Sequence, residues 1–105
     1  MKDDPLLKPF KIKHLEFKNR IIISAHEPSY AEEGLPKDKY RYYHVERAKG
    51  GIALTMTAGS AVVSEDSPPA YNNLHAYKDE IVPWLKKLTD ECHSHDTKVM
   101  IQITH

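Results

Sequence analysis

Three short apolar runs in this chain each carry residues that could contact a ligand: Ser24, Ala25 and His26 after the first run, Ala58 and Gly59 after the second, and Gln102 near the end of the third. A histidine can exchange a proton near neutral pH, an amide offers both a donor and an acceptor, and small residues let a ligand approach the backbone closely. Parallel strands place their C-terminal ends at one edge of a sheet, where α/β proteins bind small molecules. The sequence therefore predicts a small-molecule site at such an edge.

The remaining reactive residue types favour structural roles. Seven histidines invite a metal hypothesis, but His93 and His95 are two residues apart, and ligands on one helix face need a spacing of three or four. A favourable charge near a helix C-terminus explains this pair better. Cys92 lies on an apolar stripe and is expected to be a buried thiol. We expect no metal site and, with one cysteine, no internal disulfide.

Residue periodicity predicts the elements that position these side chains. Alternating apolar residues in Pro9–Lys18 predict a hairpin with its turn near Lys13 and His14. Gly50-Gly51 is a strong helix stop, and residues 62–76 are expected to form a loop. The other runs predict strands at 21–25, 52–57 and 98–103, with helices at 36–49 and 79–95 between them.

The order of these elements predicts an α/β fold in which a β-hairpin is followed by β-α-β-α-β. Consecutive right-handed crossovers put both helices on one face of a parallel sheet. The other apolar face would then meet water, unless the sheet closes into a TIM (β/α)8 barrel, which takes eight strands and ~250 residues. The chain is therefore predicted to be a partial barrel that could self-associate through its exposed sheet face and edges.

The charge balance argues against two partner classes. The 15 Lys and Arg residues offset the 15 Asp and Glu residues, so there is no basic field for nucleic acid or an anionic membrane. No uninterrupted apolar run exceeds three residues, whereas a membrane span needs about 20. The N-terminus leads into no apolar signal region, so we expect a cytoplasmic protein without nucleic-acid or membrane partners.

Five stretches carry a family resemblance and occur in one order along the chain: Asp4–Pro9, Leu15–Ile21, Tyr43–Gly51, Thr57–Ala61 and Ile101–His105. Together they resemble NADH:flavin oxidoreductases of the old yellow enzyme type. The similarity points to the branch of 2,4-dienoyl-CoA reductase, trimethylamine dehydrogenase and N-methyl-amino-acid demethylases. By this resemblance, residues 1–105 form the N-terminal portion of an FMN-binding TIM-barrel domain.

The resemblance implies a barrel that holds FMN at the C-terminal ends of its strands, with the hairpin across its bottom. It implies hydride transfer through the flavin, with NAD(P)H as a possible electron donor. The iron-sulfur cluster of the long family members, the phosphate-binding loops and the substrate-binding histidine pair would lie beyond His105.

Site residues follow from the same resemblance. Six residues match family positions that contact FMN: Ser24, Ala25, His26, Ala58, Gly59 and Gln102. The glutamine would hydrogen-bond the pyrimidine edge of the flavin, and the small residues would let the ring lie close to the backbone. Each position also has a structural alternative, namely a polar strand end, tight strand packing or a strand glutamine in a polar interior.

Three residues are candidates for facing the substrate: His26, Glu27 and His105. His26-Glu27 resembles a pair that faces the substrate in demethylase-like members, although some other members carry Cys or Thr at or beside the position of Glu27. His105 begins a histidine-containing segment of the family, and a frayed chain end is the alternative that we favour there.

Two functions from different classes remain open. The first hypothesis is that the chain is part of an FMN-dependent oxidoreductase acting on an enoyl or an N-methylated amine substrate. The alternative is a truncated, non-catalytic remnant that needs another chain to complete the barrel. On either hypothesis, we expect the isolated 105-residue chain to be inactive.

Overall fold

The computed structural model describes residues 3–68 and 72–105. It contains a short 3-10 helix, five strands and two α-helices: η1 (Pro5–Leu7), β1 (Phe10–Ile12), β2 (Leu15–Phe17), β3 (Ile22–Ile23), α1 (Asp38–Lys49), β4 (Leu54–Val62), α2 (Ile81–His93) and β5 (Lys98–Thr104). This order confirms the predicted hairpin followed by β-α-β-α-β. Residues 69–71 of the predicted loop 62–76 lie outside the described residues.

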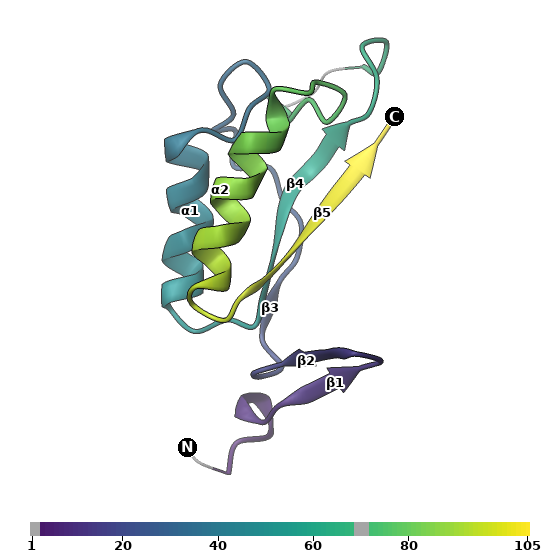
Figure 1. Cartoon of the computed structure of the whole chain (residues 1–105). Coiled ribbons are helices and arrows are strands. Elements are labelled where there is room, and N and C mark those ends of the chain that lie inside the picture. Colours follow the sequence, from purple (N-terminus) through teal and green to yellow (C-terminus); the bar gives the residue numbers. More distant parts are fainter. Residues whose placement is uncertain (1–2, 69–71) are drawn as a thin grey trace.

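Strands β3, β4 and β5 form a parallel sheet in that order. Ile22 pairs with Leu54, and Thr55 pairs with Val99. Both helices cover the same face of this sheet (Figure 1). The parallel pairing and the one-sided helical layer are as predicted from the apolar runs.

Strand β4 is longer than its sequence pattern predicts. It was expected to end at Thr57 but continues to Val62, while β3 is limited to Ile22–Ile23. Thr57 pairs with Ile101, and the next paired residue, Ala61, pairs with Ile103. Three residues of β4 (58–60) therefore lie opposite a single residue of β5, Gln102. Ala58 adopts a positive φ of 56° within this bulge. Pairing with the end of β5 extends the strand past residues of low strand propensity.

The hairpin lies beside the N-terminal ends of β4 and β5 (Figure 1). Its strands pair antiparallel, and Lys13 has a φ of 52° in the turn that was predicted there. Lys18 Nζ donates to the His95 carbonyl at 2.6 Å, and Asn19 Nδ2 donates to the Gly51 carbonyl at 2.7 Å. These bonds connect the hairpin segment to the loops that precede β5 and β4.

The main core lies between the helices and the sheet. Its buried side chains come from both helices, β4 and the following loop: Tyr40, Val45, Ala48, Ala58, Ala61, Leu74, Ile81, Leu88 and Cys92. Cys92 is buried as predicted, and this burial raises the pKa of its thiol to about 11. Arg41 Nε lies 2.8 Å from Glu91 Oε1 and joins the two helices. Helix α1 begins at Asp38, two residues after the predicted start, and Lys37 is its N-cap residue.

Within residues 3–68 and 72–105, no helix covers the opposite face of the sheet (Figure 1). The side chains of Ile22 and Met100 are exposed there, and Leu54 and Met56 line the same apolar groove. Side chains alternate along a strand, so Gln102 lies on the same face as Met100. The helix-free face of the sheet thus carries exposed apolar side chains together with Gln102.

Candidate functional site

The C-terminal ends of the three parallel strands define one rim of the sheet (Figure 1). The segment Ser24–Glu27 continues β3 toward this rim, and Gln102 faces the bulge of β4. The predicted site residues of the three strands therefore share one region of the molecule. We call this region the strand-end rim, consisting of residues 24–27, 58–60 and 102.

Gly59 allows two parts of the rim to touch. A Cβ atom at this position would lie 2.9 Å from Glu27 N and 3.1 Å from the His26 carbonyl carbon. The first distance is shorter than real Cβ contacts and the second is tighter than most, so only glycine fits without a shift of the 26–27 backbone. Gly59 thus permits close packing of two strand ends, and the space above its Cα is filled by the chain itself.

Ala58 is fully buried and tied to helix α1. Its N–H donates to the Tyr40 hydroxyl at 2.8 Å. Burial, together with the nearby negative charge of Glu27, raises the pKa of Tyr40, so this phenol stays protonated. This contact satisfies a backbone donor at the bulge, where regular strand pairing is interrupted.

Glu27 has one carboxylate oxygen in use and one free. Its Oε1 accepts the N–H of Ser29 at 2.9 Å, whereas the buried Oε2 has no hydrogen-bond partner within the described part of the chain. Burial raises the pKa of Glu27, and the Ser29 N–H and His26 partly oppose that shift. A buried carboxylate oxygen without a hydrogen-bond partner is unusual in a folded protein.

His26 is bonded to both the strand-end backbone and helix α1. Its Nδ1 lies 3.2 Å from the Ser24 carbonyl, and its Nε2 forms a short hydrogen bond with the Tyr43 hydroxyl. The imidazole and the Tyr43 ring meet edge to face, with centroids 5.4 Å apart. Residue spacing alone did not predict this contact between His26 and Tyr43.

A second histidine, His44, lies buried beneath the rim. Its Nδ1 is 2.7 Å from Thr55 Oγ1 on β4, and its Nε2 has no hydrogen-bond partner within residues 3–68 and 72–105. Burial lowers the pKa of His44 to about 4, helped by the charges of His26 and Arg47. The ring is therefore neutral at pH 7. Its place on α1 follows from the spacing of Tyr40, Tyr43, His44 and Arg47, but its hydrogen bond to Thr55 does not.

The two remaining predicted residues are Gln102 in β5 and His105, which directly follows β5. Gln102 is exposed, which leaves its amide accessible on the open face of the sheet. His105 Nδ1 lies 2.9 Å from Ser67 Oγ, in the loop that follows β4. His105 is therefore attached to a loop in this structure rather than to the residues of the rim.

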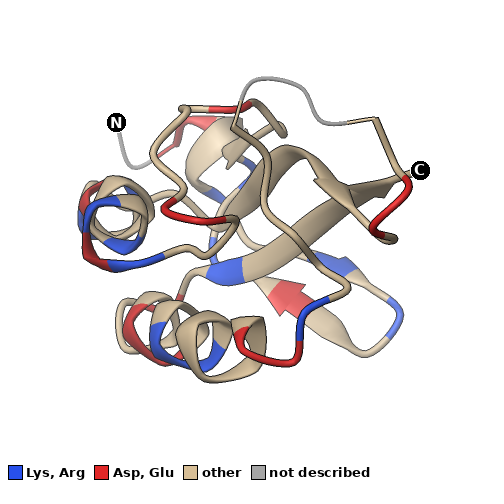
Figure 2. Cartoon of the chain, turned by 90° about the horizontal axis from the view of Figure 1, so that it is seen from above, with Lys and Arg blue, Asp and Glu red and all other residues tan. Residues whose placement is uncertain are grey.

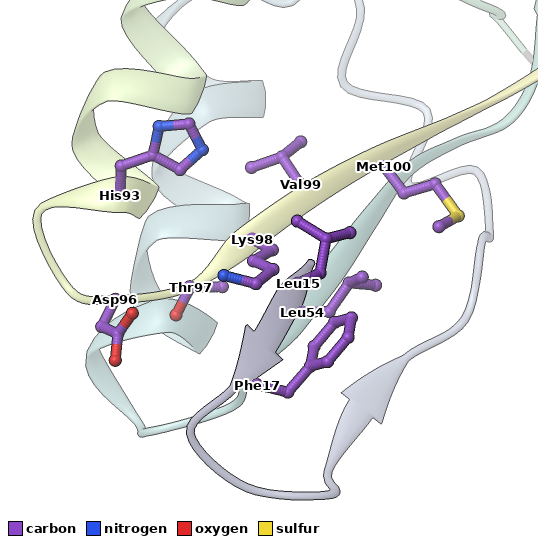
Figure 3. Close-up of a pocket in the computed structure, with 9 residues that line it drawn as sticks. All are labelled: Leu15, Phe17, Leu54, His93, Asp96, Thr97, Lys98, Val99 and Met100. Carbon is purple, nitrogen blue, oxygen red and sulfur yellow. The ribbon is translucent and has the colours of Figure 1, made fainter. Parts of the chain in front are cut away.

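Three cavities among the described residues lie away from the rim. A pocket of about 410 Å³ sits between β2 and the start of β5, with His93, Asp96 and Lys98 at its polar side (Figure 3). An apolar groove of about 350 Å³ runs between the hairpin and the open sheet face. A polar hollow of about 620 Å³ is lined by residues 63–65 and 77–80. None of the three is lined by a predicted site residue.

The described residues include no group of three or more His, Cys, Asp or Glu side chains that could hold a metal ion. Basic and acidic residues are interspersed over the helices, loops and hairpin (Figure 2). Among the helices of residues 3–68 and 72–105, none is long and apolar enough to cross a membrane.

The parallel sheet with both helices on one face defines a segment of a parallel β/α barrel. Residues 5–105 match the model of the NADH:flavin oxidoreductase / NADH oxidase family. Because this match covers nearly the whole chain, the protein belongs to that family.

Curated relatives share the whole length of this chain. It is 61% identical over 105 residues to a probable N-methylproline demethylase of Rhizobium meliloti and 44% identical over 102 residues to a multifunctional alkene reductase/demethylase of Caballeronia cordobensis. These alignments cover 100% and 97% of the chain, but only 16% and 15% of the relatives. The chain thus spans about one sixth of their length.

Solved structures show the same fold. A 2-naphthoyl-CoA reductase complex superposes with a TM-score of 0.88 at 26% identity, covering 96% of this chain and 16% of that chain. The old yellow enzyme from Pichia sp. AKU4542 superposes with a TM-score of 0.85 at 23% identity, covering 98% of this chain and 27% of that chain. The predicted partial TIM barrel is confirmed.

Proposed function

We propose that residues 1–105 form the N-terminal portion of an FMN-dependent oxidoreductase barrel. The observation that carries this proposal is the 61% identity to a demethylase along the entire chain. The strand-end rim supports it, because barrel enzymes place their chemistry at the C-terminal ends of the strands. The hairpin would cover the opposite end of the barrel.

The residues of the rim fit one edge of a flavin. Gln102 offers an amide donor and acceptor on the open face, and the exposed Ser24 hydroxyl and the backbone of Ala25 and His26 lie at the neighbouring strand end. Gly59 keeps the two strand ends close together. When bound, the flavin supplies hydride transfer, with NAD(P)H or an amine as the electron source. The chain's own residues hold the ring edge.

We propose an N-methylated amine as the substrate of the complete enzyme. Support comes from the N-methylproline demethylase at 61% identity and from the N,N-dimethylglycine/sarcosine dehydrogenase of Chromohalobacter salexigens at 40%. Reduction of an enoyl substrate is the second candidate, because the relative at 44% identity is also described as an alkene reductase.

A non-catalytic role through association is the alternative, supported by the uncovered apolar sheet face. In that case another chain, or a second copy of this one, would cover the face. The proposal otherwise includes a small-molecule partner, a cytoplasmic location and no nucleic-acid or membrane partner, in keeping with the balanced charge.

The proposal is tested by exchanging this chain for the matching segment of the Rhizobium meliloti demethylase. The chimaera is expected to purify with about one FMN per chain and to oxidise N-methylproline. A Gln102→Leu chimaera is the matched variant, and it should retain less flavin. A folded chimaera without flavin would contradict the cofactor proposal. A flavin-loaded chimaera that reduces alkenes but leaves N-methylproline unchanged would contradict the amine proposal.

A further inference from the structure

Both ring nitrogens of His26 already have partners in the protein. Nδ1 faces the Ser24 carbonyl at 3.2 Å, and Nε2 bonds the Tyr43 hydroxyl. A carbonyl oxygen can only accept a hydrogen bond, so Nδ1 must carry a proton. In a neutral imidazole Nε2 is then an acceptor, and the Tyr43 O–H is the donor.

Tyr43 is itself held firmly in place. The Arg47 guanidinium lies 3.5 Å from the centroid of its ring, and Arg47 Nη1 donates to the Tyr43 carbonyl at 2.9 Å. Tyr30 and His44 meet the same ring edge to face, at 5.7 Å and 5.2 Å between centroids.

We infer that Tyr43 is a positioning residue that holds His26 as the neutral tautomer protonated on Nδ1, with the ring orientation fixed at the end of β3. While this arrangement holds, His26 presents no free nitrogen to a ligand. His26 then shapes the rim, and Glu27 Oε2 is its unpartnered neighbouring acceptor. Any role of this arrangement in catalysis rests on the proposed function, whereas the tautomer of His26 is independent of it.

The tautomer can be measured directly on the full chain labelled with ¹⁵N-histidine, without flavin. Long-range ¹H–¹⁵N spectra distinguish a protonated ring nitrogen from an unprotonated one, and the set of peaks missing in His26→Asn assigns His26. The expected pattern at pH 7.5 is a protonated Nδ1 and an unprotonated Nε2. The reverse pattern overturns the inference, and this measurement needs no variant of Tyr43.

The role of the phenol is tested with Tyr43→Phe, which removes only the hydroxyl and keeps the ring contacts with Tyr30, His44 and Arg47. Tyr42→Phe is the matched control, because Tyr42 is 53% exposed. Tyr43→Phe is expected to shift His26 toward the Nε2-protonated form, while Tyr42→Phe leaves it unchanged. Equal tautomer populations in all three proteins would overturn the positioning role. Because no flavin is present, this outcome is independent of any failure of the proposed function.

Discussion

Polar side chains join α1 to β4 in two places, where apolar packing alone would have sufficed to hold a helix on a sheet. Tyr40 accepts the N–H of Ala58, and His44 bonds Thr55, with all four residues fully buried. Tyr40 and His44 are one helical turn apart, so both bonds arise from the same face of the helix. They specify the register of α1 against β4, and with it the position of the rim.

Removing the Tyr40 hydroxyl tests the first of these bonds. Tyr40→Phe leaves the buried Ala58 N–H without an acceptor, so we expect a loss of about 1–3 kcal/mol in the free energy of unfolding. Urea denaturation followed by circular dichroism measures it. Tyr42→Phe, at an exposed position of the same helix, is expected to change stability by less than about 0.5 kcal/mol. Equal effects of the two variants would contradict this account.

His44 makes stability depend on pH. The folded protein keeps the pKa of His44 at about 4, below its ordinary value of 6.5. The unfolded chain therefore binds a proton first as the pH falls, and stability is lost between about pH 6.5 and 4, by up to about 3 kcal/mol. Above that window His44 contributes no pH dependence.

The His44 contribution is isolated by comparing pH profiles of unfolding free energy for the wild type and His44→Gln. The variant should show a shallower decline toward pH 4, and exposed His14→Gln should follow the wild type. Glu27 acts in the opposite direction, because its raised pKa makes the folded state bind a proton more readily. The difference between the profiles cancels that effect, and identical slopes would exclude the assignment to His44.

At the scale of elements, the rim depends on how closely the segment after β3 approaches the bulge of β4. Gly59→Ala places a methyl group 2.9 Å from Glu27 N, a backbone atom that cannot rotate away. We expect a loss of about 1–3 kcal/mol from overpacking and altered amide shifts at His26 and Glu27. Gly50→Ala is the control, with a nearest contact of 3.3 Å. Unchanged shifts in Gly59→Ala would show that the two strand ends are not in contact.

The element order could be predicted because its signals are local. The β-branched run Ile21–Ile23 and the Gly50-Gly51 stop each mark an element within a few residues. The extension of β4 to Val62 could not be predicted, since Ala58–Ala61 has little strand propensity and is held by pairing with β5. Tertiary pairing overrode the local pattern there.

The candidate site, like the fold, could be predicted only in part from the sequence. The gathering of residues 24–27, 58–60 and 102 follows from parallel strands, whose ends must share an edge. The bonds from Tyr40 and Tyr43 to the rim depend on the rotation of α1 about its axis and on the path of the chain after β3. Neither quantity is encoded in residue spacing, which predicted only that these tyrosines lie on a packed helix.

At the scale of the whole molecule, the uncovered sheet face predicts self-association. Ile22 is 51% exposed and Met100 49% exposed on this face, and β5 is an edge strand of the sheet formed by the described residues. Ordering the backbone costs roughly 1–2 kcal/mol per residue, and one covered face offsets less of this than two. We expect a marginal or oligomeric chain whose sedimentation coefficient rises with concentration.

Charge substitutions test whether the uncovered sheet face mediates this self-association. Ile22→Lys should lower the concentration dependence of sedimentation, whereas Val82→Lys, at a 63% exposed position on the outside of α2, should not. A cooperative melt of a strictly monomeric wild type, shown by ultracentrifugation and calorimetry together, would contradict the prediction.

Flavin binding by the lone chain is expected to be weak, even though its rim residues fit a flavin edge. The contacts available are the Gln102 amide, the Ser24 hydroxyl and a few backbone groups, each worth only ~0.5–1.5 kcal/mol net. Association costs at least ~4 kcal/mol, and the family resemblance places the phosphate-binding loops after residue 105. Titration with FMN, followed by flavin fluorescence, should therefore show no saturation at micromolar concentration, and NAD(P)H should not be oxidised. Submicromolar binding that is lost in Gln102→Ala would show instead that three strands suffice to hold the ring, and that the rim binds FMN without the rest of the barrel.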